Sequence, residues 1–333
     1  MSPTAKAGLR LAVGLGLGGL LFYLVFRRTN VTEVVSAFRQ LQPGYLVLGM
    51  AVMLLSHVVR AARWRDLLAA AGERIPLGTA FAAVMTGYVV NYGVPRLGEV
   101  VRCSLVYRNH RTPLTTSAGT VVVDRVADVV VLLVLLLLLG LLEADLLARL
   151  VAQWGLRNPT QWLLTAGAVA AAGAVAAGLA WRYRRRLATL PVLKTAIGLA
   201  EQVVTAMASI RRLRSPARFV GYTALIWVGY WLSTVWLLQS HAPSHGYYFG
   251  LVLMLLGAAG MALPSPGGVG SFHAAIQLGF LGYGLSGTAG ALAALIIHSS
   301  QLVATVVVGL LSYLYLTLQP PATALKPESL PQG

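Results

Sequence analysis

Long apolar stretches dominate the chain and alternate with short polar or basic segments. A helix that spans a membrane needs about 20 mainly apolar residues. Six stretches meet this requirement, namely residues 8–26, 45–62, 118–142, 162–181, 219–238 and 288–316. Arg27 and Arg28 follow the first stretch in place of a small-residue cleavage site, which favours a retained span over a signal peptide. The pattern therefore predicts an all-α, polytopic membrane protein with about six full spans.

Two further apolar segments are interrupted by proline and glycine. Residues 79–111 break at residues 91–96, and residues 247–284 break at residues 264–270. The halves on either side of each break are too short to cross a membrane alone. We expect each segment to form a re-entrant helical hairpin with its break at the tip, because broken backbone at membrane depth must be buried in protein or line a cavity. The alternative is a tilted span with a proline kink.

Three segments outside the spans have other patterns. Residues 31–41 are short and amphipathic, which is typical of a helix lying in the membrane interface. Residues 190–214 indicate an amphipathic cytoplasmic helix, and the proline-rich residues 318–333 indicate a disordered tail. Residues 1–317 are thus expected to form a single transmembrane domain.

Composition excludes a soluble protein. The chain is 57% hydrophobic and only 11% charged, against about 25% charged residues in an ordinary soluble domain. Lys and Arg outnumber Asp and Glu by 26 to 10. In so apolar a chain this excess indicates cytoplasmic loops rather than a nucleic-acid partner. A single cysteine, Cys103, excludes an internal disulfide, and no metal-ligand or cofactor pattern is present in the sequence.

The positive charges predict the topology. With both termini in the cytoplasm, 21 Lys and Arg residues are cytoplasmic, including those of segment 60–76, and five are outside. This agrees with the positive-inside rule. The first interrupted segment must then enter from inside and the second from outside. Residues 45–142 and 219–316 become two inverted units, an arrangement that in transporters places the binding site between the interrupted segments.

Charged residues inside the predicted membrane region come only from the first unit, because residues 219–325 contain no Asp, Glu, Lys or Arg. The candidates are Arg96, Glu99, Arg102, Asp124, Arg125 and Asp128. Charges at membrane depth are costly and usually functional, and arginine suits phosphate. We expect Arg96 and Arg102 to bind an anionic headgroup, with the other four as supporting ion pairs. The alternative is that pairs such as Arg96–Glu99, Arg102–Asp124 and Arg125–Asp128 only stabilise the bundle.

At the second break, backbone groups rather than charged side chains are the candidates for binding a ligand. Gly267, Gly268 and Gly270 leave backbone N–H groups accessible, and Ser271 is expected to be the N-cap of the next helix. Together with Asn91 from the first break, these residues are candidates for the rest of a phosphate site. A purely structural turn is the alternative.

His273 and His298 lie in segments without charge and are candidates for a proton relay. Alternatively they are neutral and hydrogen-bonded to a neighbouring helix. The sequence contains no nucleophile elbow, no Walker loop and no other catalytic constellation. We therefore expect a protein that is not an enzyme.

Three motifs occur in a fixed order: residues 91–102 (NYGVPRLGEVVR), Asp124-Arg125-x-x-Asp128, and Pro264-x-Pro266-Gly267-Gly268-x-Gly270. In these motifs the chain resembles the lysylphosphatidylglycerol synthase transmembrane (flippase) domain family, over nearly its whole length. The resemblance implies an inner-membrane protein that moves lipids between leaflets, as a stand-alone member without the soluble synthase domain. The family often has Glu where this chain has His273.

Taken together, these features predict a flippase that moves an anionic, phosphate-bearing lipid across the cytoplasmic membrane. Its headgroup would lie between the two hairpin tips. The expected partners are the membrane lipid and either a second copy of the chain or an enzyme that makes the lipid. The alternatives are a membrane-embedded enzyme that modifies lipid headgroups, an accessory subunit of one, and a non-catalytic scaffold.

Overall fold

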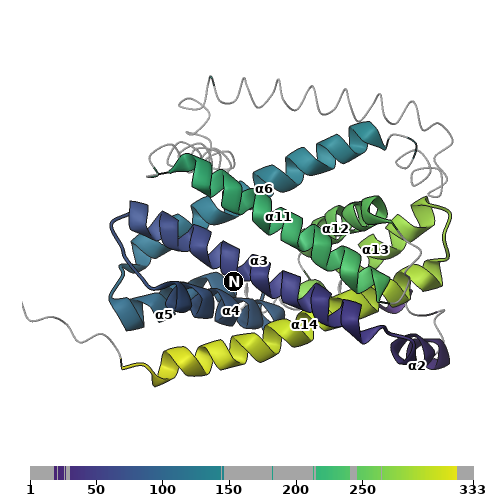
Figure 1. Cartoon of the computed structure of the whole chain (residues 1–333), viewed down its shortest axis with the longest axis horizontal. Coiled ribbons are helices and arrows are strands. Elements are labelled where there is room, and N and C mark those ends of the chain that lie inside the picture. The colour runs from purple at the N-terminus through teal and green to yellow at the C-terminus, as the bar shows by residue number, and fades with distance from the viewer. Residues whose placement is uncertain are drawn as a thin grey trace, which may run out of the picture.

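The computed structural model describes residues 31–143, 215–240, 246–263 and 265–320, with a few isolated residues elsewhere. All regular elements in these ranges are helices (Figure 1), as the sequence predicts. The predicted span 162–181, the amphipathic helix 190–214, most of the span 8–26 and the tail after residue 320 lie outside the described residues.

Four described helices are long and apolar enough to cross a membrane. They are α3 (Pro43–Ala70), α6 (Leu114–Leu142), α11 (Pro216–Gln239) and α14 (Gly287–Leu318). Each contains one of the predicted spans. Helix α3 extends eight residues beyond the predicted end at residue 62, through a basic stretch. The shorter α2 (Val31–Arg39) corresponds to the predicted interfacial helix.

Short helices flank both predicted breaks. Helices α4 (Leu77–Gly93) and α5 (Leu97–His110) lie on either side of the first break. At the second break, α12 (Tyr247–Ala262) is followed by the 3-10 turn η1 (Pro266–Gly268) and α13 (Ser271–Gly282). The order of one long, two short and one long helix therefore occurs twice in the chain.

The two groups of four helices pack in equivalent ways. Helix α3 lies antiparallel to α11 along most of their lengths (Figure 1), where a Cβ on Gly229 would come within 2.6 Å of Ser56 Cβ. Helix α14 packs on α4 and α13, and α6 packs on α12 and α5. The counterparts are α3 and α11, α4 and α12, α5 and α13, and α6 and α14. When each helix is replaced by its counterpart, the contacts of α14 with α4 and α13 become those of α6 with α12 and α5. Such an arrangement is expected of a repeated unit.

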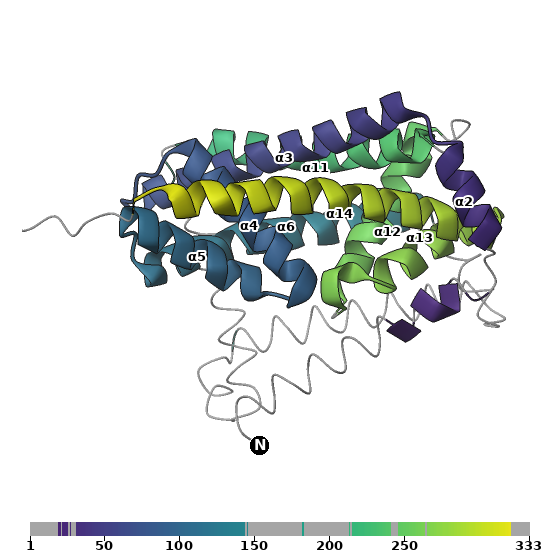
Figure 2. The ribbon, with the colours of Figure 1, turned by 90° about the horizontal axis from the view of Figure 1, so that it is seen from below.

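The short helices form two hairpins that enter the bundle from opposite ends. In Figure 2, α4 and α5 approach the middle from one end, and α12 and α13 approach it from the other. Their breaks meet, since η1 packs on α4. A Cβ on Gly267 would lie 2.6 Å from Cδ1 of Tyr92, so this contact is close.

The first hairpin closes through a glycine contact and a side-chain brace. The Gly98 N–H donates to Oδ1 of Asn91 at 2.7 Å, and Gly87 lies directly opposite Gly98. At its base, Nη2 of Arg108 donates to the Thr317 carbonyl at 3.2 Å, which ties α5 to the last turn of α14. The first hairpin is thus held at both its tip and its base.

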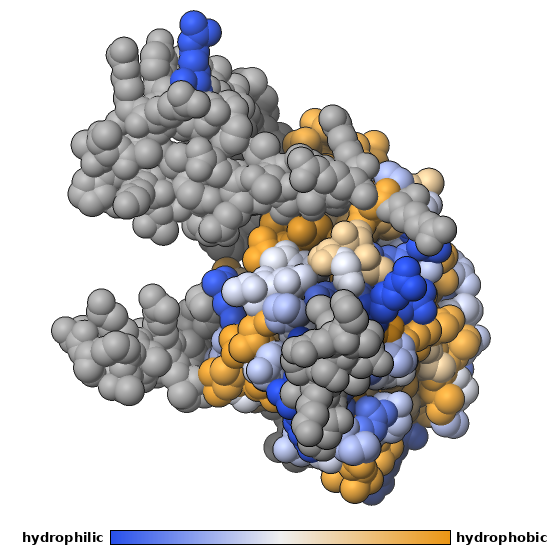
Figure 3. All heavy atoms as spheres, turned by 90° about the vertical axis from the view of Figure 1, so that its left-hand side faces the viewer, coloured by the Kyte–Doolittle hydropathy of each residue, from blue (hydrophilic) through white to orange (hydrophobic). Residues whose placement is uncertain are grey.

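The described outer surface is largely apolar on its flanks. In Figure 3, which faces the end where α3 ends and α6 begins, hydrophilic residues gather on the end face and apolar residues surround them. Along α6 the side chains of Leu133, Leu137 and Leu141 are exposed. An apolar flank beside a polar end is the surface expected of a protein in lipid.

Candidate functional site

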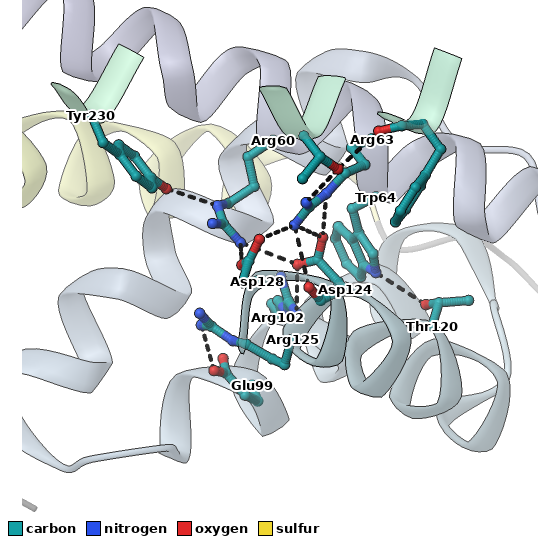
Figure 4. Close-up of polar contacts among 12 residues, drawn as sticks. Arg60, Arg63, Trp64, Glu99, Arg102, Thr120, Asp124, Arg125, Asp128 and Tyr230 are labelled. Atoms are coloured by element: carbon teal, nitrogen blue, oxygen red, sulfur yellow. Dashed lines mark hydrogen bonds and ion pairs between the residues drawn. The ribbon is translucent and has the colours of Figure 1, made fainter. Parts of the chain in front are cut away.

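A buried ion-pair cluster links α3 to α6 (Figure 4). Nη2 of Arg63 lies 2.7 Å from Oδ1 of Asp124 and 2.7 Å from Oδ1 of Asp128, and Nη1 of Arg60 lies 2.6 Å from Oδ2 of Asp128. The arginines are three residues apart and the aspartates four, so each pair shares one helix face. Asp124 and Arg63 have no exposed side-chain surface.

Helix α11 completes the hydrogen bonding of both arginines. Nε of Arg60 donates to the hydroxyl of Tyr230, and Nη1 of Arg63 donates to Oγ1 of Thr223, each at 3.0 Å. The cluster therefore joins helices from both halves of the chain. Breaking one partner of a buried, hydrogen-bonded ion pair typically costs about 3–5 kcal/mol, so the cluster holds α3, α6 and α11 in one arrangement.

Helix α5 brings a third guanidinium, Arg102, against the same carboxylates. Its Nη2 lies 3.6 Å from Oδ2 of Asp124, and its Cζ lies 4.8 Å from the ring centroid of Trp64. Only 2% of Arg102 is exposed, yet its Nε finds no hydrogen-bond acceptor among the described residues. A buried polar group without a partner is rare in a native structure, and it makes Arg102 available to an added anion.

The cluster carries an excess of positive charge. Three buried guanidinium groups, from Arg60, Arg63 and Arg102, face the two carboxylates of Asp124 and Asp128. The neighbouring pair adds no net charge, because Nη2 of Arg125 lies 2.5 Å from Oε1 of Glu99 (Figure 4). Among the described residues, one positive charge of the cluster is therefore left uncompensated, and it can attract an anion.

The structure contains only some of the ion pairs considered from the sequence. Arg102 does pair with Asp124. Glu99 pairs with Arg125 and not with Arg96, so the pairs Arg96–Glu99 and Arg125–Asp128 are absent among the described residues. All four expected supporting residues are engaged in ion pairs.

Arg96 occupies a position unlike that of the buried arginines. It is the N-cap of α5 with φ of 69°, a left-handed conformation that is uncommon outside glycine. Its side chain is exposed and has no ion pair within the described residues. It therefore stands at the first break with a free guanidinium, while Arg102 lies two turns further along α5.

Glycines shape the second break as the sequence suggests, with one correction. Positive φ angles, which residues other than glycine rarely adopt, occur at Gly267, Gly268 and Gly270. Ser271 is not the N-cap of α13, since Gly270 takes that place. The Ser271 hydroxyl instead lies 2.6 Å from that of Ser265, which closes the turn on itself.

The two histidines lie together behind this break. His273 on α13 and His298 on α14 are buried, with ring centroids 5.1 Å apart. The ring of Tyr92, from the first break, meets His298 edge-on at 6.3 Å. The structure thus places both candidate relay residues next to the contact between the breaks. Asn91, by contrast, has its Oδ1 engaged in bracing the first hairpin.

Arg60 and Arg63 are the residues that the sequence interpretation missed. The sequence interpretation counts both in a cytoplasmic segment and does not expect them in a site, whereas the structure places them inside the bundle, where they are 3% and 0% exposed. A signal was present, because two arginines on one helix face match two aspartates on one face of a later helix. The positive-inside rule cannot recognise this match between two helix faces, because the rule treats every arginine near the end of a span alike. Among the described residues, no group of three or more His, Cys, Asp or Glu could hold a metal ion.

The model of the family described as "Lysylphosphatidylglycerol synthase TM region" matches residues 11–309. The chain belongs to this family. The match includes both breaks and every charged residue of the cluster. Searches of curated proteins and of solved structures found no match.

Family membership and the apolar helices agree on the broad setting. The protein is a multi-pass membrane protein, and its function concerns membrane lipids. The cluster and the two breaks are the polar features that such a function can use.

Proposed function

We propose that this protein is a translocase that moves an anionic, phosphate-bearing lipid across the cytoplasmic membrane. In this proposal both chain termini are cytoplasmic, and the two hairpins are re-entrant. The hairpin helices have 17, 14, 16 and 12 residues, so each falls short of the roughly 20 needed to span a bilayer.

The observation that carries the proposal is the incomplete hydrogen bonding of the Arg102 guanidinium. Arg102 is buried in a cluster with one excess positive charge, and its Nε has no acceptor among the described residues. A singly charged phosphate group would neutralise the excess and supply that acceptor. Zwitterionic or neutral headgroups offer no such compensation of charge.

The breaks would complete the site. Arg96 would meet the headgroup first, because its side chain is exposed at the first tip. Backbone around Gly267, Gly268 and Gly270, with Ser271, would contact the phosphate from the second tip. The acyl chains would remain in lipid beside the apolar flank.

The paired architecture suggests how access could alternate. The two groups of four helices share the antiparallel α3–α11 contact and meet again where η1 packs on α4. Rocking of one group against the other would open the contact between the breaks toward one leaflet at a time. The ion-pair cluster, which joins α3 and α6 of one group to α11 of the other, would act as the fixed point.

An enzymatic function receives less support. A headgroup-modifying enzyme needs a free base or nucleophile, but the carboxylates of Asp124 and Asp128 each contact two or more guanidinium groups. Mass spectrometry of lipids incubated with purified protein would detect turnover if this alternative were right.

A fluorescent-lipid assay tests the proposal. Purified protein is reconstituted in phosphatidylcholine vesicles with a trace of fluorescently labelled phosphatidylglycerol, and lipid movement is followed by dithionite bleaching. We expect Arg96→Ala to slow movement at least tenfold without changing the melting temperature. Arg111→Ala is the matched control, because Arg111 is also exposed with positive φ but lies at the hairpin base. Equal rates for the two variants would contradict the proposed site.

A further inference from the structure

We propose that His273 and His298 together bind one proton that crosses the membrane with the anionic headgroup. This inference rests on the proposed function and adds its energy coupling. It makes the protein a proton–lipid symporter rather than a passive scramblase.

The position of the pair connects it to the lipid site. His298 contacts Tyr92, and Tyr92 lies against Gly267 at the meeting point of the two breaks. His273 is two residues beyond Ser271, within the first turn of α13. Any movement that separates the breaks must therefore change the surroundings of both imidazoles.

None of the described residues in ring contact with the pair carries a compensating charge. Residues 219–325 have no Asp, Glu, Lys or Arg, so α12, α13 and α14 supply no carboxylate and no permanently charged cation. Helix α12 packs on α13 through Gly257 and Gly260. From the described part of the N-terminal segment, Phe22 contacts His273 with its ring.

Among the described residues of the other neighbouring helices, the titratable groups nearest to the pair are tyrosines and a histidine. Tyr92 of α4 is the titratable side chain in ring contact with the pair. One turn away, Tyr88 contacts His57 of α3, which in turn contacts Tyr230 of α11, the partner of Arg60. Helix α2, which carries the exposed Glu33 and Arg39, also contacts α14.

Two imidazoles at this separation can share one proton but cannot both be protonated, because two positive charges at so short a distance repel each other strongly. An imidazolium at membrane depth without a counter-ion is also costly. A phosphate held between the breaks would supply the missing negative charge. By linkage, the bound phosphate then raises the proton affinity of the pair, and the bound proton raises the affinity for the lipid.

One atom argues against a purely structural pair. Nε2 of His298 is buried and has no hydrogen-bond partner among the described residues. A histidine kept only to join helices is normally satisfied by a neighbour. Here the ring nitrogen keeps a free lone pair or N–H next to the tip contact, as a proton-binding group requires. The proton adds to that nitrogen on one side of the membrane and leaves from the pair on the other.

The test measures how a pH gradient distributes lipid between leaflets. The full chain is reconstituted in phosphatidylcholine vesicles with a trace of fluorescent phosphatidylglycerol, and a pH difference of one unit is imposed and checked with internal pyranine. Coupling to one proton predicts about a tenfold excess of labelled lipid in the leaflet facing the alkaline side. A potassium diffusion potential should not change this ratio, because a proton and a monoanion move together without net charge.

Variants assign the effect to the pair. We expect His298→Gln and His273→Gln each to bring the leaflet ratio back to one while lipid still equilibrates. His110→Gln, at the base of α5 beside Thr79, should retain the tenfold ratio.

The outcomes separate this inference from the proposed function. Wild-type protein that equilibrates lipid but ignores the pH gradient overturns the inference and leaves the proposed function standing. Retention of the gradient response in both histidine variants also overturns it. Absence of lipid movement in wild-type protein under every condition overturns the proposed function, and the inference with it.

Discussion

At the scale of the residue, the important feature is how unequal the arginines are. Arg63 is fully buried and makes hydrogen bonds to Asp124, Asp128 and Thr223. Arg102 is equally buried but incompletely bonded, and Arg96 is exposed and unpaired among the described residues. The arginines proposed to bind the lipid therefore differ from Arg63 in their hydrogen bonds and not in burial alone.

Asp124 should be the residue on which the stability of the cluster depends most. It faces Arg60, Arg63 and Arg102 with no exposed side-chain surface. Asp124→Asn leaves these cations without their main counter-charge and should lower the free energy of unfolding by about 3–5 kcal/mol. Thermal unfolding of the purified protein in detergent would measure the loss.

Asp66→Asn provides the matched control. Asp66 pairs with Arg65 and Arg218, whose side chains are substantially exposed. Exposed pairs contribute about 0–1 kcal/mol, so this variant should unfold close to the wild-type temperature. If both variants lost the same stability, the cluster would not be the stabilising centre inferred from its geometry.

At the scale of the element, the first hairpin depends on glycine. Gly98 and Gly87 allow the backbones of α4 and α5 to touch, and the Gly98 N–H is held by Asn91. Small residues at such contacts are a general feature of helix packing in membranes. The hairpin is therefore closed by backbone proximity rather than by large side chains.

Gly98→Ala should open this contact. The added methyl carbon would lie 2.6 Å from the carbonyl carbon of Gly87, a backbone atom that cannot move aside alone. We expect a loss of about 2 kcal/mol or more, measured by thermal unfolding in detergent. Gly93→Ala is the control, because nothing lies within 4 Å of its added methyl group and alanine favours helix. Gly98→Ala with wild-type stability would contradict the close contact.

At the scale of the whole molecule, topology follows from where the hairpins begin and end. Both ends of the α4–α5 hairpin lie at the end of the bundle where α3 ends, and both ends of the α12–α13 hairpin lie at the opposite end (Figures 1 and 2). If the long helices cross the membrane, each hairpin must leave on the side from which it enters.

Cysteine labelling would test this arrangement. In a Cys103→Ser background, Arg74→Cys and Arg111→Cys should react with a membrane-impermeant maleimide only from the cytoplasmic side. Gly246→Cys and Ser286→Cys should react only from outside. All four positions are exposed in the structure. Labelling of residues 74 and 111 from opposite sides would show that α4 and α5 cross the membrane instead.

Much of the fold could be predicted from local pattern. Helix length and hydropathy alone indicate α3, α6, α11 and α14, because a lipid environment requires about 20 apolar residues for each span. Proline and glycine indicate both breaks, since few other residues interrupt a helix so reliably. Helix ends were less predictable: α3 continues past residue 62 to Ala70, and the carboxylates that pair with its arginines lie in another helix.

What the sequence determined by itself was the membrane class, the places where helices break, and the family, because each depends on short-range pattern. Only the tertiary structure decided which charges meet. It placed Arg60 and Arg63 in the buried cluster, paired Glu99 with Arg125, and brought His273 beside His298. Ion pairing depends on which helix faces lie opposite each other, and residues 60 and 124 become neighbours only after the helices between them have folded back.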